Sequence, residues 1–191
     1  QAFTSPKYLY DALGSRLFEA ITELPEYDLT RTEAQLMRLH SADMAQHVPA
    51  GACWIDLGAG NCEKAGRLLG PLQAGRYVAV DISVDFVRQA LDSLQRQHPG
   101  LAIAGLGTDF SGGLALPDAL GLDPTQPRVL FYPGSSIGNF TPDQALGFLQ
   151  SLHRACGTAP GSGLLIGVDL LKDAAELEAA YDDALGVTAA F

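Results

Sequence analysis

The stretch 52–60 reads Ala52-Cys53-Trp54-Ile55-Asp56-Leu57-Gly58-Ala59-Gly60, a short and nearly unbroken apolar run that stops at two glycines. A run of this kind is typical of a β-strand that is covered on both faces, as the strands of parallel sheets are. Glycines directly after such a strand let the backbone turn tightly into a helix. These residues therefore predict a buried strand followed by a strand-to-helix turn.

Strand-like and helix-like segments alternate on the carboxyl-terminal side of this run. Further strand candidates lie at residues 77–80, 101–106, 129–132 and 164–170, and helical patterns lie at 62–72, from Ser83 as a cap to His98, and at 142–156. The last helix opens with Thr141 as a cap, a proline at the first helical position and Gln144 at the third. The alternation predicts an α/β fold with a doubly wound, mostly parallel sheet joined by right-handed crossovers.

Two helical patterns precede the sheet. They cover residues 8–24 and 31–47, and Pro25 separates them. Residues 30–33, Thr-Arg-Thr-Glu, can be interpreted as a capping box at the start of the second helix. We expect the two helices to form a helical lead-in before the first strand.

Length and charge narrow the function classes. The chain has 191 residues, 47% of them hydrophobic, which suits one compact α/β unit with a real core. Twelve Lys and Arg residues against 22 Asp and Glu residues give a net charge of −10. A negative field repels phosphate backbones and anionic membrane surfaces, so we expect no nucleic-acid and no membrane partner. No apolar segment has the pattern of a signal peptide or the length of a membrane span.

The cysteines and histidines suggest neither a disulfide framework nor a metal site. The three cysteines, Cys53, Cys62 and Cys156, lack C-x-x-C spacing and fit reduced thiols in a cytoplasm. The four histidines are scattered without the spacing that metal ligands need. The sequence therefore predicts a cytoplasmic protein with no metal.

Polar and glycine residues follow each predicted strand, where ligands of open parallel sheets bind. Gly58 and Gly60 follow the first strand. Asp81 ends the second, where a carboxylate can accept hydrogen bonds from both hydroxyls of a ribose. Asp109 and Phe110 follow the third strand. The carboxylate could accept a hydrogen bond from the amino group of an adenine, and the ring could pack against the face of the base. A loop of small and polar residues, 133–140, follows the fourth. The combination predicts an adenosine site.

The residue at position 63 discriminates between two adenosine-containing cofactors, a dinucleotide and S-adenosylmethionine. A dinucleotide-binding turn needs a third glycine three residues after Gly60, but Glu63 stands there and would repel a pyrophosphate. S-adenosylmethionine carries a sulfonium and no phosphate, so acidic surroundings are acceptable. The sequence therefore favours the methyl donor, with a nicotinamide-dependent oxidoreductase as the disfavoured alternative.

Longer motifs carry a family resemblance. In chain order they are Leu24-Pro25-Glu26-Tyr27, Thr30-Arg31-Thr32-Glu33, Asp56-Leu57-Gly58-x-Gly60-x-x-Glu63-Lys64, Gly134-Ser135-Ser136-Ile137-Gly138-Asn139, Asp169-Leu170-x-Lys172-Asp173, Ala180-Tyr181-Asp182-Asp183 and Gly186-Val187-Thr188-Ala189. From about Ser5 to Phe191 the chain resembles the histidine-specific Nα-methyltransferases of ergothioneine biosynthesis. The resemblance implies a Rossmann-like class I methyltransferase sheet, S-adenosylmethionine as cofactor, and trimethylation of the α-amine of L-histidine to hercynine.

The resemblance also implies roles for individual residues. The expected cofactor contacts are Gly58, Gly60, Lys64, Asp81, Asp109 and Phe110, with Lys64 on the cofactor carboxylate. The expected substrate contacts are Tyr27, Asn139, Tyr181 and Thr188. Asn139 is the catalytic candidate, because methyl transfer to an amine needs orientation of that amine more than a covalent nucleophile. Tyr27 is expected near the imidazole or closing the pocket, and Tyr181 and Thr188 on the substrate carboxylate.

The same resemblance suggests a division of the chain. We expect a cofactor-binding domain at 51–172, with the N-terminal helices of 1–50 and the segment 173–191 belonging to a substrate domain. Family members continue beyond the position of Phe191, so we expect the sheet and the substrate domain to be incomplete here and the remainder of the chain to be a partner of this piece. Glu176, Glu178, Asp182 and Asp183 are interpreted as one solvated helical face.

Two alternatives stay open within this resemblance. A family member that acts on another amino acid would carry almost the same motifs in these residues. A truncated piece could also bind the cofactor without completing the substrate pocket, and it would then have no activity.

Overall fold

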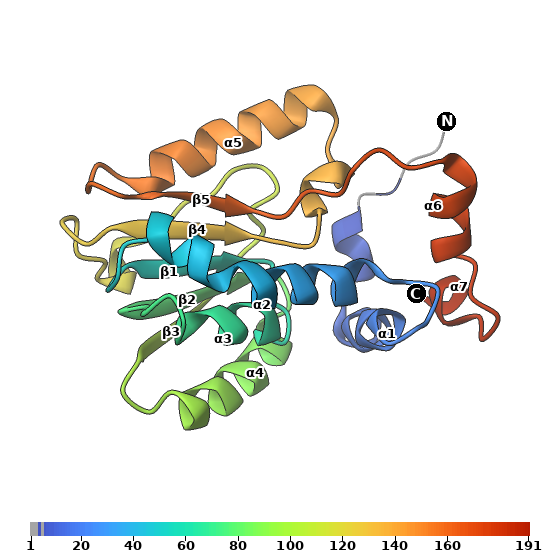
Figure 1. Cartoon of the computed structure of the whole chain (residues 1–191), viewed down its shortest axis with the longest axis horizontal. Helices are drawn as coiled ribbons and strands as arrows, with labels where there is room; N and C mark the ends of the chain where they lie inside the picture. The colour runs from blue at the N-terminus through green and yellow to red at the C-terminus, as the bar shows by residue number, and fades with distance from the viewer. Residues whose placement is uncertain (1–3, 5) are drawn as a thin grey trace.

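The computed structural model describes residue 4 and residues 6–191, and it contains a sheet of five strands in the order β3-β2-β1-β4-β5. Every strand pair is parallel, as predicted (Figure 1). The strands are β1 (Cys53–Leu57), β2 (Arg76–Asp81), β3 (Ala102–Gly107), β4 (Arg128–Tyr132) and β5 (Gly163–Ile166). The helices are η1 (Pro6–Leu9), α1 (Ala12–Thr22), α2 (Leu29–His47), α3 (Glu63–Leu69), α4 (Val84–Gln97), η2 (Asp118–Leu120), η3 (Ser136–Asn139), α5 (Pro142–Cys156), α6 (Ala174–Ala180) and α7 (Val187–Ala190).

The strand that decides the fold lies at the centre of the sheet. All five residues of β1 are buried, and its backbone pairs with β2 on one side and β4 on the other. Successive side chains of a strand point to opposite faces, so Trp54 and Ile55 enter different cores. An apolar run without alternation is therefore what a central parallel strand requires.

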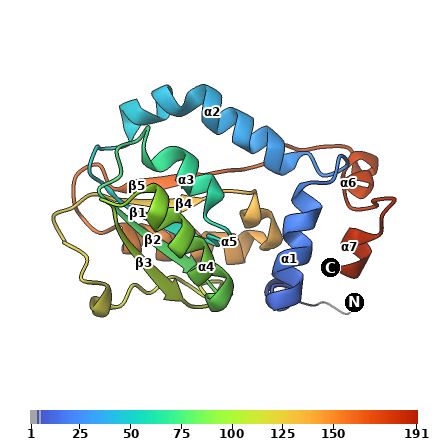
Figure 2. The ribbon, with the colours of Figure 1, turned by 90° about the horizontal axis from the view of Figure 1, so that it is seen from below.

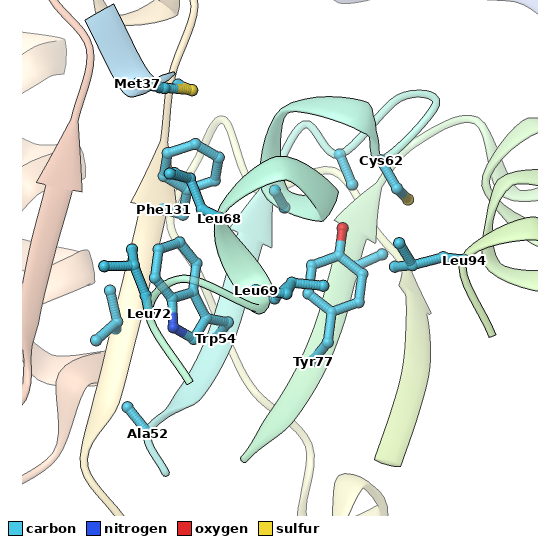
Figure 3. Close-up of a cluster of buried hydrophobic side chains, with 14 of the residues drawn as sticks. Met37, Ala52, Trp54, Cys62, Leu68, Leu69, Leu72, Tyr77, Leu94 and Phe131 are labelled. Carbon is cyan, nitrogen blue, oxygen red and sulfur yellow. The ribbon is translucent and has the colours of Figure 1, made fainter. Parts of the chain in front are cut away.

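One face of the sheet is covered by α2, α3 and α4. Trp54 and Phe131 from neighbouring strands pack at 5.4 Å between ring centroids, and leucines of α3 cover them (Figure 3). Met37 of α2 and Leu94 of α4 close the two ends of this core. The lead-in helix α2 is thus a structural part of the sheet's covering layer along part of its length.

The opposite face is covered by α5 and by the segment between β3 and β4. Ile55, Val80 and Leu130 from three strands pack against Phe148 and Leu152 of α5. The α5 helix begins at the predicted capping box, in which Thr141 Oγ1 accepts from the Gln144 amide and the Gln144 side chain accepts from the Thr141 amide. Helices on both faces confirm the doubly wound α/β fold.

Helices α1, α6 and α7 gather beyond the carboxyl ends of the strands, on the side to which the arrows of β4 and β5 point (Figures 1 and 2). Five rings join these segments, and we call them the aromatic cluster: Tyr10, Phe18, Tyr27, Tyr181 and Phe191. The cluster brings residues 10–27 against residues 181–191. The carboxyl-terminal edge of the sheet therefore faces a second layer of helices.

The lead-in differs from its prediction in two places. The segment 8–24 is not one helix. The η1 helix ends at Leu9, and α1 begins after Asp11, which caps it by accepting from the amides of Leu13 and Gly14. The second helix begins at Leu29, before the predicted capping box, so Thr30 lies inside α2 and its capping role was wrong.

The start of α4 and the end of β5 also differ from the prediction. Ser83 is the residue before α4, but its hydroxyl donates to the carbonyl of Tyr10 at 2.7 Å instead of capping the helix. The strand predicted at 164–170 ends at Ile166, because the next residues turn away from the sheet and the amide of Asp169 donates to Ser135 Oγ. Both corrections arise from contacts with distant segments, which local patterns do not contain.

Candidate functional site

A cavity of about 1050 Å³ lies at the carboxyl ends of the strands. It is bounded by the turns after β1, β2, β3 and β4 and by the lead-in helices. Eight of the predicted site residues line it: Tyr27, Gly58, Gly60, Lys64, Asp81, Asp109, Phe110 and Asn139. The fold thus brings together side chains from positions 27 to 139 around one hollow.

The glycine turn after β1 has a backbone shape that most residues avoid. Gly58 and Gly60 have φ angles of +73° and +52°, in the left-handed region that glycine adopts without steric cost. The amide of Gly58 donates to the Val80 carbonyl at 2.8 Å, and the amide of Gly60 donates to Asp81 Oδ2 at 3.0 Å. The turn after β1 is therefore held directly by the end of β2.

Asp81 is fixed by backbone donors on both carboxylate oxygens. Its Oδ2 accepts from Gly60, and its Oδ1 accepts from the amide of Ser83 at 2.8 Å. Each carboxylate oxygen can accept a second hydrogen bond, and Asp81 lines the cavity. Asp81 therefore has the position and the acceptor capacity that a ribose diol needs.

Asp109 and Phe110 form the wall after β3. Asp109 accepts from Lys7 Nζ at 2.7 Å and from the Ser111 hydroxyl and amide, and these bonds lower the pKa of Asp109 to about 2. The Phe110 ring packs beside Phe148 at 6.0 Å, and a side chain at Gly58 would touch that ring. The flat wall of Phe110 suits the face of an aromatic base. Lys7, on η1, was not foreseen at this position.

Lys64 of α3 lines the cavity, and an acidic side chain outside the cavity wall forms an ion pair with it. Its ammonium lies 2.7 Å from Oε2 of Glu33, a residue of α2 that is 9% exposed. Oε1 of the same carboxylate accepts from the amide of Gly134 at 2.6 Å. The capping box predicted at residues 30–33 gives Glu33 a role at a helix end, and the structure shows it inside α2 instead. The local sequence contains no pattern that indicates its contacts with Lys64 and Gly134.

Asn139 ends η3 in the loop after β4, and it is exposed at the cavity. The loop is shaped by the left-handed residues Gly134 and Ser135, with φ angles of +77° and +55°. The backbone bond from Gly138 to the Ser135 carbonyl closes the turn at 2.9 Å. The Asn139 amide is thus presented on a short, tightly turned loop.

Tyr27 and Tyr181 meet at the edge of the cavity. Tyr27 is 6% exposed, and its ring lies edge-on to that of Tyr181 at 5.7 Å. Burial raises the pKa of the Tyr27 phenol well above its usual value, so it stays protonated. Tyr181 lies outside the large cavity and lines a neighbouring one of about 330 Å³, which Tyr27 also lines.

Thr188 lies on α7 and lines neither cavity. Its amide donates to Asp183 Oδ2 at 2.8 Å, and the amide of Val187 donates to Oδ1 at 2.9 Å. These bonds, that of Thr188 first, lower the pKa of Asp183 to about 2. Asp183 is 7% exposed, so its assignment to a solvated helical face was wrong.

A buried acid lies beneath the glycine turn. Asp56 is 2% exposed, and the Tyr77 hydroxyl donates to its Oδ2 at 2.7 Å. Burial raises the pKa of Asp56 to about 7, against the opposing effect of the Tyr77 hydrogen bond. Asp56 belongs to the strand that decides the fold, but its pattern alone did not indicate a perturbed acid.

Among residues 4 and 6–191 no helix has the length and apolar character to cross a membrane. The same part of the chain contains no group of three or more His, Cys, Asp or Glu side chains arranged to hold a metal ion.

The chain is similar to known proteins over nearly its whole length. A family model described as "Histidine-specific methyltransferase, SAM-dependent" matches residues 1–191. The histidine N-alpha-methyltransferase of Mycolicibacterium smegmatis is 40% identical over 190 residues, which is 97% of this chain and 57% of that protein. Ergothioneine biosynthesis protein 1 of Neurospora crassa is 35% identical over 96% of this chain and 21% of its own length.

Solved structures extend the likeness of fold. The mitomycin 7-O-methyltransferase MmcR superposes with a TM-score of 0.52 and 14% identity, over 90% of this chain and 47% of that one. At this identity the likeness concerns the fold alone. It agrees with the Rossmann-like methyltransferase sheet expected from the sequence.

Proposed function

The chain belongs to the histidine-specific, S-adenosylmethionine-dependent methyltransferases, and we propose that its protein trimethylates the α-amine of L-histidine to give hercynine, a step of ergothioneine biosynthesis. The chain spans 57% of the length of the Mycolicibacterium relative. Activity and substrate of the full-length protein are therefore proposed from the relatives and from the cavity.

One observation carries the proposal: a single cavity is lined both by the predicted cofactor contacts and by two predicted substrate contacts, Tyr27 and Asn139. Its volume of about 1050 Å³ is at the upper end of the usual range of roughly 300–1,000 Å³ for small-molecule sites. A cofactor and a small amino acid together need a site of that size. Methyl transfer requires both molecules in one cavity, with the reacting atoms in line.

The residues of the cavity fit S-adenosylmethionine, which when bound supplies an electrophilic methyl group on a sulfonium. Asp81 would accept from the ribose hydroxyls, and Phe110 would lie against the adenine, with Asp109 near its amino group. Lys64 would bind the carboxylate of the methionine part. The turn at Gly58 and Gly60 presents backbone without a Cβ, which lets a ligand approach closely.

The chain's own part in the reaction is positioning. Asn139 has an amide that can accept from the substrate amine and point its lone pair toward the methyl donor. Tyr27 is held protonated and buried, so it can donate its phenolic hydrogen to the imidazole. An α-amine at a chain end titrates at about 7.7–8.0, so a proton must leave it before attack, and water at the open side of the cavity can take that proton.

We propose the same division of labour along the chain as the sequence suggested. Residues 51–172 would form the cofactor-binding unit, and 1–50 with 173–191 would contribute to the substrate side. The aromatic cluster supports this division because it joins the first segment to the last. The reduced cysteines of the sequence support a cytoplasmic location.

Titration calorimetry of the full-length protein tests the proposal. We expect heat on addition of S-adenosylmethionine or its demethylated product, and then heat on addition of L-histidine. Cofactor heat without histidine heat, but with heat from another aromatic amino acid, would reassign the substrate. Cofactor heat with no amino-acid heat at all in the full-length protein would contradict an amino-acid substrate.

The Asn139→Ala variant tests the catalytic assignment. We expect turnover to fall by roughly 10–100-fold, because the loss of one hydrogen bond to a charged or reacting group is worth about 1.5–3 kcal/mol. Cofactor affinity should stay unchanged. Histidine affinity and turnover that both match the unmodified protein would remove Asn139 from the reaction.

A further inference from the structure

Glu33 is a buried acid with two partners and no direct part in the cavity wall. It extends from α2 toward the loop after β4, where it binds the Lys64 ammonium with one oxygen and the Gly134 amide with the other. Its side chain is 12% exposed, against 29% for that of Lys64. The cation faces the cavity, and the acid lies behind it.

The surroundings of Glu33 leave it little freedom. A side chain at Gly167, just after β5, would overlap Glu33 Oε1, and a side chain at Gly134 would come within 3.0 Å of Lys64 Nζ. Two glycines from different loops thus make room for the acid and for the cation. A long lysine side chain normally samples many rotamers, and this packing holds its ammonium in one place.

We propose that Glu33 is a positioning residue for the cofactor: from α2 it fixes both the Lys64 ammonium and the Gly134 turn before the ligand arrives. This inference rests on the proposed function, because it takes the ligand of Lys64 to be the carboxylate of S-adenosylmethionine. Preorganisation of a binding group lowers the ordering cost that a ligand must otherwise offset. The same contact links α2 to the loop that carries Asn139.

The opposite role for Glu33 makes a different prediction. An acid that merely competes with the cofactor carboxylate for Lys64 would weaken binding, and its removal would tighten it. A positioning acid strengthens binding, and its removal loosens the cation. The sign of the change in cofactor affinity therefore separates the two roles.

The test compares Glu33→Gln with the unmodified full-length protein, using two cofactors. S-adenosylmethionine has the carboxylate, and decarboxylated S-adenosylmethionine lacks it. We expect Glu33→Gln to weaken binding of the first by about tenfold and to change binding of the second by less than about twofold. Asp43→Asn is the matched control, because Asp43 lies on the same helix in an exposed pair with His40. It should change neither affinity.

Several results would overturn the proposal. The first is an equal loss of affinity for both cofactors, which general damage to the fold would produce. The second is no loss of affinity for either cofactor, and the third is tighter binding of S-adenosylmethionine. The Lys64→Met background provides a second check. There, the additional Glu33→Gln change should have no further effect on affinity for S-adenosylmethionine, and a full further loss would mean that Glu33 does not act through Lys64.

A measurement without any ligand keeps this inference separate from the proposed function. Hydrogen exchange of the Gly134 amide should be at least about fivefold faster in Glu33→Ala than in the unmodified protein, because that amide loses its acceptor. Unchanged exchange would contradict the contact even if histidine is methylated. Faster exchange together with an absence of histidine binding would instead refute the proposed substrate and leave the positioning contact intact.

Discussion

The two sides of the cavity that we propose for the cofactor and for the substrate are held by different kinds of contact. On the cofactor side, Gly60 and Ser83 donate backbone hydrogen bonds to Asp81, and all three residues lie within one strand-turn-helix unit and its neighbour. On the substrate side, Tyr27 meets Tyr181 and Phe18 meets Phe191 through ring packing between segments more than 100 residues apart. Backbone geometry determines the first side around Asp81, and ring packing between distant segments determines the second.

This difference has a functional consequence. The backbone donors of Gly60 and Ser83 lie directly after central strands, which belong to the part of a fold that opens last. Rings on short helices keep their positions only while the opposite segment is in place. We therefore expect cofactor binding and substrate binding to respond separately to substitutions on the two sides.

The largest expected effect comes from breaking the cofactor side at Asp81. Asp81→Asn replaces a charged acceptor of two backbone amides, and we expect the affinity for S-adenosylmethionine to fall by roughly 10–100-fold. Titration calorimetry measures it. Asp85→Asn, four residues away in an exposed pair with Arg88, is the control and should bind normally. A loss below about threefold at Asp81 would contradict its assignment to the ribose.

A smaller and selective effect is expected on the substrate side. Tyr181→Ala removes a ring that packs on Tyr27 and is itself 56% exposed. We expect the KM for histidine to rise by about tenfold and the affinity for S-adenosylmethionine to stay within about twofold. Steady-state kinetics measures the first quantity and calorimetry the second. Tyr181→Phe retains the ring contact and distinguishes packing from a contact through the hydroxyl.

A parallel loss of cofactor affinity in Tyr181→Ala would contradict the separation of the two sides. It would mean that the aromatic cluster supports the cofactor turns as well. A histidine KM that does not move would remove Tyr181 from the substrate side.

The cofactor side was predictable from the sequence because its information is local. A buried parallel strand must end in a turn, and its glycines and the acid at the end of the next strand follow at fixed spacing. Gly58, Gly60, Asp81, Asp109 and Phe110 accordingly line one cavity. The all-parallel sheet followed from the same alternation of patterns.

The remaining site contacts depend on segments that are distant in sequence. Lys7 binds Asp109 across 102 positions, and Glu33 binds Gly134 across 101. No periodicity or spacing rule contains such pairs. Asp183 shows the same limit at short range, because its burial depends on α7 folding back over it. Charged residues in a helical pattern look solvated until their partners are known.

The smallest expected effect is a pH dependence of stability at the buried acid beneath the glycine turn. Asp56 has a pKa raised from 3.8 to about 7 in the folded chain. Between these values the folded state keeps a proton that the unfolded state has released. Its contribution to stability is therefore fully present below about pH 4 and is lost as the pH rises to about 7.

Asp56→Asn tests this sign. The amide oxygen can still accept from Tyr77, and it cannot ionise. Relative to the unmodified protein, we expect the Tm of Asp56→Asn to be higher at pH 8 than at pH 5 by roughly 2–4 °C or more. Asp92→Asn, at an exposed position of α4, should show no such difference. A relative Tm that falls between pH 5 and pH 8 would contradict the buried, proton-retaining acid.

Mass analysis of the amino acid after incubation tests the central claim most directly. The full-length protein is mixed with S-adenosylmethionine and L-histidine, with tryptophan and tyrosine in parallel reactions, and the products are resolved by mass. We expect histidine to gain up to three methyl groups on its α-nitrogen, and tryptophan and tyrosine to gain none. Methylation of another amino acid with histidine unchanged, or no methylation in a protein that binds the cofactor, would contradict the proposed function.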